Sequence, residues 1–442
     1  MNDLRILTLH HDMPDVKSYT TILFERILPI LKSKKKVHIT WLVHKNEKIE
    51  KKEKISNDIT ILDIHDFDNA VQVIQKVKPN LVYVMPGLNA PDYALVLAAK
   101  YFGIPVIGGE IGIEFCTKNM KIQFLKSLIT QFFQKSISSH NKEKPQLMGK
   151  GRFFIYKNIF LLKTQIAIKQ NKLKIIKEFF WLLFMYVSRS RNIRFNSKFS
   201  VDLHFLDGEI MINQLLDAGF KKSSLIVTGN PIYDTIFQEM QEIKDESKYS
   251  KKNRVLLVTS NVFGFEHNWV KIKKDHMIKK VISEIKKHNK SSKHNKPIEL
   301  SIKIHPSRES LEEYRNLIHK IDPSIMIYQK ESILELLKET DVVISTSSGT
   351  AMVYGLLLKK PLIIHDCLEL DHDELLEREL VVECKELSNI IPSIEKAISF
   401  NPPTKNIDEF FKDILLKLDG KSAERISDAI VNLLDNNIQQ SN

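Results

Sequence analysis

Four short stretches of the sequence combine residue types that bind or transform small ligands, and each follows an apolar run. The strongest is DVVISTSSGTAMVYG (341–355), in which the apolar run leads into Ser347, Ser348, Gly349 and Thr350. Free backbone N–H groups at a helix N-terminus attract anions, and hydroxyl groups add hydrogen-bond donors. We expect a phosphate-binding loop here. The alternative is an ordinary turn in which Ser and Thr cap a helix.

A histidine and an asparagine occupy two further expected strand ends. In IKIHPS (302–307), His305 precedes a proline that can start a helix without an N–H donor, and its ring could contact a phosphate or a base. In LIVTGNPIYD (225–234), Asn230 belongs to a Thr-Gly-Asn-Pro turn. Turn chemistry alone also explains both stretches, so neither assigns a ligand by itself.

Candidate acids and bases lie in the N-terminal third of the chain. Glu110, in IPVIGGEIGIEF (104–115), directly follows an expected strand end, where its carboxylate can face a cleft or simply favour a helix N-terminus. His11 and Asp12 follow the first expected strand. Carboxylates and imidazoles are the usual groups of general acid–base catalysis.

The sequence offers little for a metal ion. Cys116, Cys367 and Cys384 form no ligand spacing, and no Asp-x-Asp stands at an expected strand end. The acidic run HDCLELDHDE (365–374) contains groups that could be ligands, but we interpret it as a solvated or substrate-facing loop. We therefore predict neither a metal nor another cofactor.

The elements that must position these residues alternate between strands and helices. Short β-branched runs separated by helical patterns are typical of βαβ units and a parallel sheet. The expected strands are 4–9, 37–43, 59–64, 81–86, 105–109, 203–206 and 225–229, and then 254–260, 299–305, 324–329, 341–345 and 361–365. In open sheets of this kind, ligands bind at the carboxyl ends of the strands.

Two runs of such units predict an α/β fold with two Rossmann-like domains facing across a cleft, and a basic helical insertion in the N-terminal one. A polar, Lys-rich stretch separates the runs. The expected parts are the N-terminal domain (1–117, completed by 199–237), the insertion (118–198), a linker (238–253), the C-terminal domain (254–400) and C-terminal helices (401–442).

The insertion carries the whole basic excess of the chain. The 442 residues have a net charge of +12, from 66 Lys and Arg against 54 Asp and Glu. Residues 118–198 hold 18 basic residues and two acids, a net of +16, so the remaining 361 residues sum to −4. The longest apolar run, 179–187, has nine residues against the roughly 20 of a membrane span.

Three interpretations of the insertion stay open. Its lysines scatter around a helical wheel, so one clean amphipathic helix is not supported. Several shorter helices, with Trp181 and Tyr186 at an interface and Arg189, Arg191 and Arg194 flanking it, could contact an anionic membrane surface. The segment could instead pack on the protein or a partner. Nucleic acid is the weakest interpretation, because no nucleic-acid-binding motif accompanies the charge.

Three stretches resemble blocks of the UDP-N-acetylglucosamine 2-epimerase family, in the same order. They are PDYALVLAAKYFGIPVIGGEIG (91–112), VDLHFLDGEIMINQLLDAGFKKSSLIVTGNPIYD (201–234) and DVVISTSSGTAMVYGLLLKKPLI (341–363). The resemblance implies the two-domain fold called GT-B and a nucleotide-sugar site. It would place the nucleotide phosphates on Ser348, Gly349 and Thr350.

The sequence departs from that family at four turns. Residues 10–14 replace the family's Gly-x-Arg-Pro turn, and residues 85–89 replace its His-Gly-Asp turn. Residues 260–263 replace its His-Arg-Glu turn, and residues 347–350 replace its Asp-Ser-Gly-Gly loop. Among the family's catalytic acids and bases that can be aligned, only Glu110 remains. A reaction that removes and returns a proton needs several such groups. His305-Pro306 with Ser347-Ser348 instead resembles bacterial capsule and sialic-acid glycosyltransferases, in which such a pair holds the donor nucleotide.

These patterns lead to one principal hypothesis and two alternatives. The first is a metal-independent glycosyltransferase that moves a sugar from a nucleotide-sugar donor to a polysaccharide or lipid-linked acceptor, in the cytoplasm and at the membrane surface. His305, Ser347 to Thr350 and Asn230 would bind the donor, and Glu110, His11 or Asp12 would be the base. The alternatives are a 2-epimerase-type isomerase and a non-catalytic nucleotide-sugar-binding subunit of surface-polysaccharide assembly. No nucleic-acid partner is expected.

Overall fold

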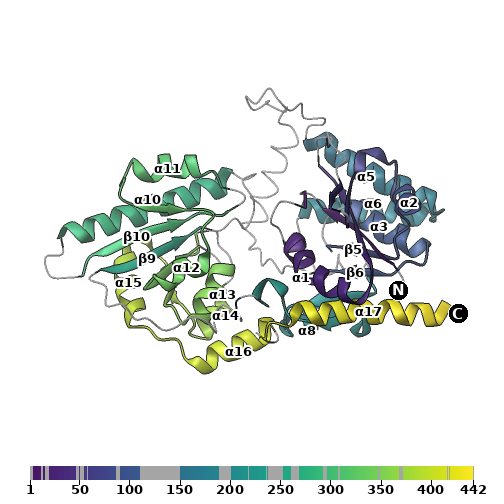
Figure 1. The fold of residues 1–442 in the computed structure, drawn as a ribbon. Helices are drawn as coiled ribbons and strands as arrows, with labels where there is room; N and C mark the ends of the chain where they lie inside the picture. Colours follow the sequence, from purple (N-terminus) through teal and green to yellow (C-terminus); the bar gives the residue numbers. More distant parts are fainter. Residues whose placement is uncertain are drawn as a thin grey trace. The chain divides into compact units, whose positions relative to one another are not determined.

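The computed structural model describes residues 3–109, 150–188, 201–236, 252–259, 268–306, 309–346, 349–367 and 372–441, with short gaps inside these ranges. The chain forms two compact units. The described residues of unit 1 lie in 3–236 and 412–441, and those of unit 2 lie in 252–411. Figure 1 shows a sheet with flanking helices in each unit.

The sheet of unit 1 has eight strands. They are β1 (Leu4–His10), β2 (Val37–Val43), β3 (Lys54–Ser56), β4 (Ile59–Asp63), β5 (Leu81–Val84), β6 (Val106–Gly108), β7 (Leu203–Leu206) and β8 (Leu225–Val227). Their order across the sheet is β3-β4-β2-β1-β5-β6-β7-β8. Every neighbouring pair is parallel except β3 and β4, so the unit is a doubly wound sheet with one added antiparallel edge strand.

Helices cover both faces of this sheet. They are α1 (Tyr19–Lys34), α2 (Ala70–Val77), α3 (Ala90–Tyr101), α5 (Lys150–Ala167), α6 (Lys172–Ser188), α8 (Ile210–Asp217) and α17 (Ser422–Ser441). One core cluster joins the sheet to α2, α3 and α5, and another joins it to α1 and α17. Because α5 covers the outer side of α3, nearly all of α3 is buried, which explains why its sequence is apolar almost all round.

The last helix of the chain completes unit 1. The carboxylate of Asp234 accepts hydrogen bonds from the backbone N–H groups of Ser422 (3.0 Å) and Ala423 (2.8 Å), at the start of α17. Arg425 donates from Nε to the carbonyl of Thr228 at 2.7 Å. The Thr-Gly-Asn-Pro turn after β8 is therefore the anchor of α17.

Unit 2 has a six-stranded parallel sheet. Its strands are β9 (Asn253–Val258), β10 (Ile298–Lys303), β11 (Met326–Tyr328), β12 (Val342–Ser345), β13 (Leu362–Ile364) and β14 (Val382–Glu383), in the order β11-β10-β9-β12-β13-β14. Its helices are α10 (Asn268–Ser291), α11 (Leu311–His319), α12 (Ile333–Lys338), α13 (Thr350–Leu357), α14 (Asp373–Glu377) and α15 (Ile390–Ser399). A further helix, α16 (Thr404–Leu415), crosses the boundary to unit 1. This strand order is that of the Rossmann fold.

The predicted fold class of two Rossmann-like domains is confirmed. The expected strands 37–43 and 203–206 coincide with β2 and β7, and the others differ from their strands by a few residues. The described part of the basic insertion forms two helices, α5 and α6, and most of the predicted linker 238–253 lies outside the described residues. No helix in the described ranges combines the length and apolar character that crossing a bilayer requires.

Candidate functional site

Four strands of unit 2 end at the same level. The backbone register pairs Val258 of β9 with Lys303 of β10 and with Ser345 of β12, and Ser345 with Ile364 of β13. All four strands are parallel, so the residues that follow them begin four neighbouring loops at one edge of the sheet. The first residues of these loops are Thr259, Ile304, Thr346 and His365.

The centre of this edge is the topological switch point of the sheet. From β9 the chain proceeds to β10 and β11 on one side, and β12 lies on the other side of β9. Loops leave in opposite directions at such a point, which opens a crevice above the strand ends where ligands of open α/β sheets bind. The two loops that flank it begin at Thr259 and at Thr346.

The loop after β12 leads into helix α13. Ser347 and Ser348 lie outside the described residues, whereas Gly349 and the backbone of Thr350 are described. The carbonyl of Gly349 accepts from the N–H groups of Met352 and Val353, so Gly349 stands at the N-cap of α13. A Cβ atom built on Gly349 would meet nothing within 4 Å. Among the described residues, then, no side chain crowds the Cα of Gly349 at the positive end of this helix.

A buried carboxylate holds the neighbouring loops in place. Glu309 Oε2 accepts from the backbone N–H of His305 at 2.6 Å and from the hydroxyl of Thr259 at 2.5 Å. These two residues follow β10 and β9, respectively. Glu309 thus ties the His305 loop to the strand end at the switch point.

The same carboxylate is bound to two helices. Its Oε1 accepts from Lys274 Nζ of α10 at 2.5 Å and from the hydroxyl of Tyr314 of α11 at 3.2 Å. Glu309 and Lys274 side chains are 0% and 3% exposed. Burial, reinforced by the charge of Glu309, raises the pKa of Tyr314 above its ordinary value, so this hydroxyl remains a donor. We name Thr259, Lys274, His305, Glu309 and Tyr314 the Glu309 cluster.

A second histidine, His365, stands at the end of β13. Its Nδ1 lies 2.7 Å from the carbonyl oxygen of Cys384. A carbonyl can only accept, so Nδ1 carries the hydrogen, and in the neutral ring Nε2 has the free lone pair. The backbone N–H of His365 donates to Ser345 at the end of β12, which places this half-buried residue beside the loop of Thr346.

Asn230 lies in unit 1, and its side chain is occupied by structural hydrogen bonds. Its Oδ1 accepts from the N–H of Ile232 at 2.9 Å, and its Nδ2 donates to Asp207 at 2.7 Å. The residue is 6% exposed. The bond to Ile232 lies within the turn that anchors α17, and the bond to Asp207 ties this turn to the end of β7.

The predicted bases Glu110, His11 and Asp12 lie outside the described residues. Of their described neighbours, Gly109 directly follows strand β6 and His10 is the last residue of strand β1. Register relations through β5 bring these two strand ends to the same edge of the first sheet. This edge also contains the switch point of unit 1, between β1 and β5.

Metal-ligand geometry is absent from the residues that the structure describes, where no three His, Cys, Asp or Glu side chains converge. His372 Nε2 and Asp366 Oδ1, in the predicted acidic run, are 4.0 Å apart. Residues 368–371 of that run lie outside the described ranges.

Sequence reasoning missed the Glu309 cluster except for His305. The signal for Glu309 was present, since it is an acid four residues after His305 at a loop between an expected strand and helix. Lys274 had no signal, because α10 contains many lysines that are alike in sequence and differ only in burial.

Comparisons with known proteins place this architecture. MnaA from S. aureus, solved with UDP, superposes with a TM-score of 0.53 at 15% identity, covering 98% of this chain and 97% of its own. The UDP-GlcNAc 2-epimerases of Neisseria meningitidis and Methanocaldococcus jannaschii, each solved with UDP-GlcNAc, both superpose with a TM-score of 0.52, at 14% and 15% identity, respectively. Each superposition covers 98% of this chain and 100% of the other. These likenesses support the two-domain fold. No curated protein matches the sequence.

The family match covers more than half of the chain. The model of the family described as UDP-N-acetylglucosamine 2-epimerase matches residues 193–431. This range includes all of the described part of unit 2, with the switch-point loops and the Glu309 cluster, together with the end of unit 1. The chain therefore belongs to the UDP-N-acetylglucosamine 2-epimerase family.

Proposed function

We propose that the protein is an enzyme that binds a UDP-sugar at the switch point of unit 2 and transfers the sugar to an acceptor hydroxyl. The observation that supports binding is the level edge of four parallel strands, where the N-terminus of α13 at Gly349 and the anchored residue His305 follow strands on the two sides of β9. Both the family match and the neighbours with bound UDP or UDP-GlcNAc favour a uridine nucleotide as the ligand.

The diphosphate would interact with the N-terminus of α13. Its negative charge suits the positive end of the helix, and Gly349 leaves the approach to the backbone open. Ser347, Ser348 and the hydroxyl of Thr350 are proposed as further donors, and His305 as a contact to a phosphate or the base. Breaking the bond between the sugar and the β-phosphate adds charge to the departing nucleotide, and donors fixed in advance stabilise that charge.

The Glu309 cluster would contribute by positioning. Its carboxylate fixes the backbone of His305 and the hydroxyl of Thr259, which follow the carboxyl ends of β10 and β9. Because Lys274 and Tyr314 hold the same carboxylate from two helices, the backbone N–H of His305 is already fixed before a ligand arrives. Such pre-organisation saves entropy on binding.

Transfer is proposed over epimerisation because the sequence has lost most of the acids and bases of the family pattern. Glu110, or else His11 or Asp12, would then deprotonate the acceptor. Epimerisation at C2 is the second candidate, and the family match itself favours it. Both reactions break the bond between the sugar and the β-phosphate, so both use the proposed site in unit 2.

Calorimetric titration with UDP, UDP-GlcNAc and a purine nucleotide tests the site. We expect the uridine ligands to bind, and we expect His305→Ala combined with Ser348→Ala to weaken binding about 10- to 100-fold, as charge-assisted hydrogen bonds are lost. His276→Ala, at an exposed position of α10 in the same unit, is the matched control. Unchanged affinity in the double variant would exclude this site.

Product analysis separates the two reactions. The protein is incubated with UDP-GlcNAc in deuterated water, with and without oligosaccharide or lipid-linked acceptors. Deuterium at C2 identifies an epimerase, and sugar transferred without deuterium identifies a transferase. Glu110→Gln should abolish turnover with little change in donor affinity. Binding without any turnover would favour the non-catalytic subunit.

A further inference from the structure

The helices α5 and α6 expose most of the large apolar side chains on the described surface. Fourteen large hydrophobic residues are exposed among the described residues, and eight of them belong to these two helices. They are Ile155, Ile159, Leu162 and Ile166 on α5, and Leu173, Ile176, Phe179 and Phe180 on α6. We name these eight residues the hairpin patch.

The patch follows the helical repeat. On α5 its members are spaced i, i+4, i+7 and i+11, and on α6 three of them are spaced i, i+3 and i+7, so each helix has an apolar stripe. The opposite side of α5 is buried against the core through Phe160, Leu161 and Thr164. The stripe on α5 therefore faces away from the unit.

A buried acid fixes the orientation of α6. Glu178 accepts from Gln165 Nε2 of α5 at 2.8 Å and from Gln170 at 3.2 Å, and it is hydrogen-bonded to Tyr93 of α3. Burial, with the charge of Glu178, raises the pKa of Tyr93. Since Glu178 points inward, Leu173, Ile176 and Phe180 are left outside, with exposed fractions of 70%, 52% and 63%.

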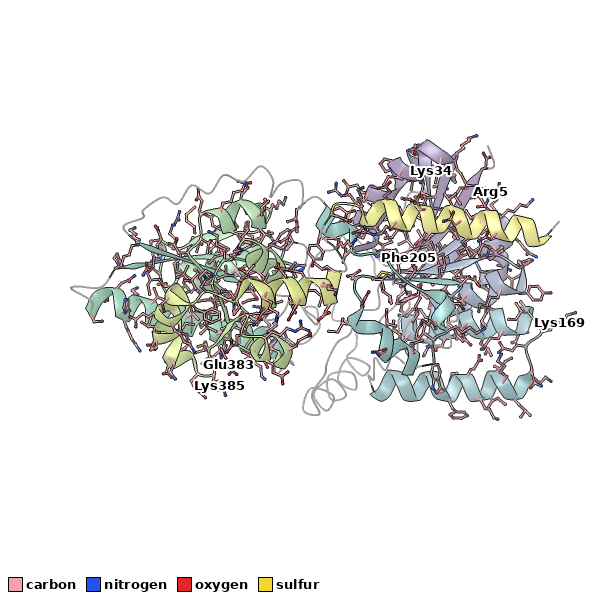
Figure 2. The ribbon with its side chains drawn as sticks, turned by 90° about the horizontal axis from the view of Figure 1, so that it is seen from below. Arg5, Lys34, Lys169, Phe205, Glu383 and Lys385 are labelled. Carbon is pink, nitrogen blue, oxygen red and sulfur yellow. The ribbon has the colours of Figure 1, made fainter. Side chains whose placement is uncertain are left out.

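Positive charge surrounds the stripes. Residues 150–188 contain eight Lys and Arg and one acid, the buried Glu178. In the described part of the chain, no carboxylate forms an ion pair with Lys169, Lys172 or Lys177. Lys169 lies in the turn between α5 and α6, and the other two lie on α6. Figure 2 shows Lys169 at the outer end of the hairpin, with its side chain directed away from the sheet.

We propose that the hairpin patch binds an anionic lipid surface. Apolar side chains that enter the headgroup boundary, flanked by lysines that meet lipid phosphates, are the composition of interfacial helices. A second copy of the chain suits this face less well, because each copy would bring the same uncompensated positive charge to a two-fold contact. The lysines of the insertion scatter around a helical wheel, whereas the exposed apolar residues lie on one side of each helix. The apolar stripes could be recognised only from the burial of each side chain in the structure.

Vesicle flotation tests the proposal with the full chain. We expect binding to phosphatidylcholine vesicles that contain about a quarter phosphatidylglycerol, weak binding to pure phosphatidylcholine, and weakening by salt. Leu173→Asn with Phe180→Asn should abolish it. Replacing Lys169, Lys172 and Lys177 with Gln should lower the affinity about 100-fold, from about 1 kcal/mol per lysine.

Matched variants elsewhere keep the test specific. Ile272→Asn with Met326→Asn removes two equally exposed apolar side chains from unit 2, and Gln at Lys287, Lys385 and Lys405 removes three exposed lysines there. Both should bind vesicles like the wild type. Circular dichroism and UDP titration confirm that each variant is folded.

Three results would overturn the proposal. One is a wild-type chain that does not bind the anionic vesicles. Another is equal loss of binding in the hairpin variants and in the unit 2 variants. The third is a wild-type dimer in light scattering that the Asn variants convert to a monomer without any effect on vesicles, which would assign the patch to a second copy.

Discussion

The buried pair Lys274–Glu309 gives the sharpest prediction about stability. Replacing Glu309 with Gln keeps the shape of the side chain but removes the charge that Lys274 contacts at 2.5 Å, with both side chains almost fully buried. Breaking a buried ion pair from one side costs about 3–5 kcal/mol, because the remaining charge stays in the interior. We expect Glu309→Gln to reduce the free energy of unfolding of unit 2 by that amount.

The reverse change should also destabilise unit 2. Lys274→Met leaves the carboxylate with three other donors, from Thr259, His305 and Tyr314, so we expect a loss of about 1–3 kcal/mol. The double variant contains neither charge and should be more stable than Glu309→Gln alone. The effects are then non-additive, as expected for residues in direct contact.

Native-state hydrogen exchange measures these values within unit 2. The slowest amides of β9 and β10 report the free energy of its global opening, whatever unit 1 does. Glu313→Gln is the control, since this carboxylate is 59% exposed and pairs with Lys271 at 3.4 Å at the surface. The buried ion pair would be refuted as a stabilising contact of unit 2 by either of two results. One is a loss of less than about 1 kcal/mol of unfolding free energy in Glu309→Gln, and the other is a double variant whose loss equals the sum of the two single losses.

Three further predictions concern buried groups. Burial lowers the pKa of His204 to about 3, so between about 6.5 and 3 the unfolded chain binds the proton and the folded chain does not. Thermal unfolding should show unit 1 losing up to about 1.4 kcal/mol per pH unit on acidification in this window, and His204→Phe should flatten the slope. Gly109→Ala should destabilise unit 1, since its Cβ would lie 2.1 Å from the hydroxyl of Tyr83, and adding Tyr83→Phe should partly restore thermal stability. Burial raises the pKa of Cys367 to about 12, so iodoacetamide labelling followed by mass spectrometry should find it slow to react in the native chain and fast in urea.

The sequence predicted every described strand except β3 and β14. β2 and β12 are runs rich in β-branched and apolar residues between polar flanks, which is what burial on two faces requires. β3 and β14 have three and two residues, too few to show any period. Their places depend on the neighbours with which they pair.

Some residues of the candidate site have local sequence signals, and others depend on tertiary packing. The loop at Gly349 and the histidine at His305 were predictable because strand ends and helix starts have local signals. Lys274 was not, because its burial depends on how α10 lies on the sheet. Asn230 carries a local turn signal as well, but its hydrogen bond to Asp207 comes from a loop more than 20 residues earlier and could not be predicted from the turn.

The way α17 closes unit 1 affects how the protein is made. Ile426, Ile430 and Leu434 belong to the same core cluster as strands β1 and β2, although roughly 380 to 430 residues separate them in the chain. Unit 2 is encoded between the two parts of unit 1, so the ribosome finishes unit 2 first. At a synthesis rate of about 5–20 residues per second, the apolar residues of β1 and α1 remain uncovered for tens of seconds until α17 has been made. During synthesis, unit 1 is thus the unit in need of chaperones, and nascent chains that end before residue 422 should be bound by them.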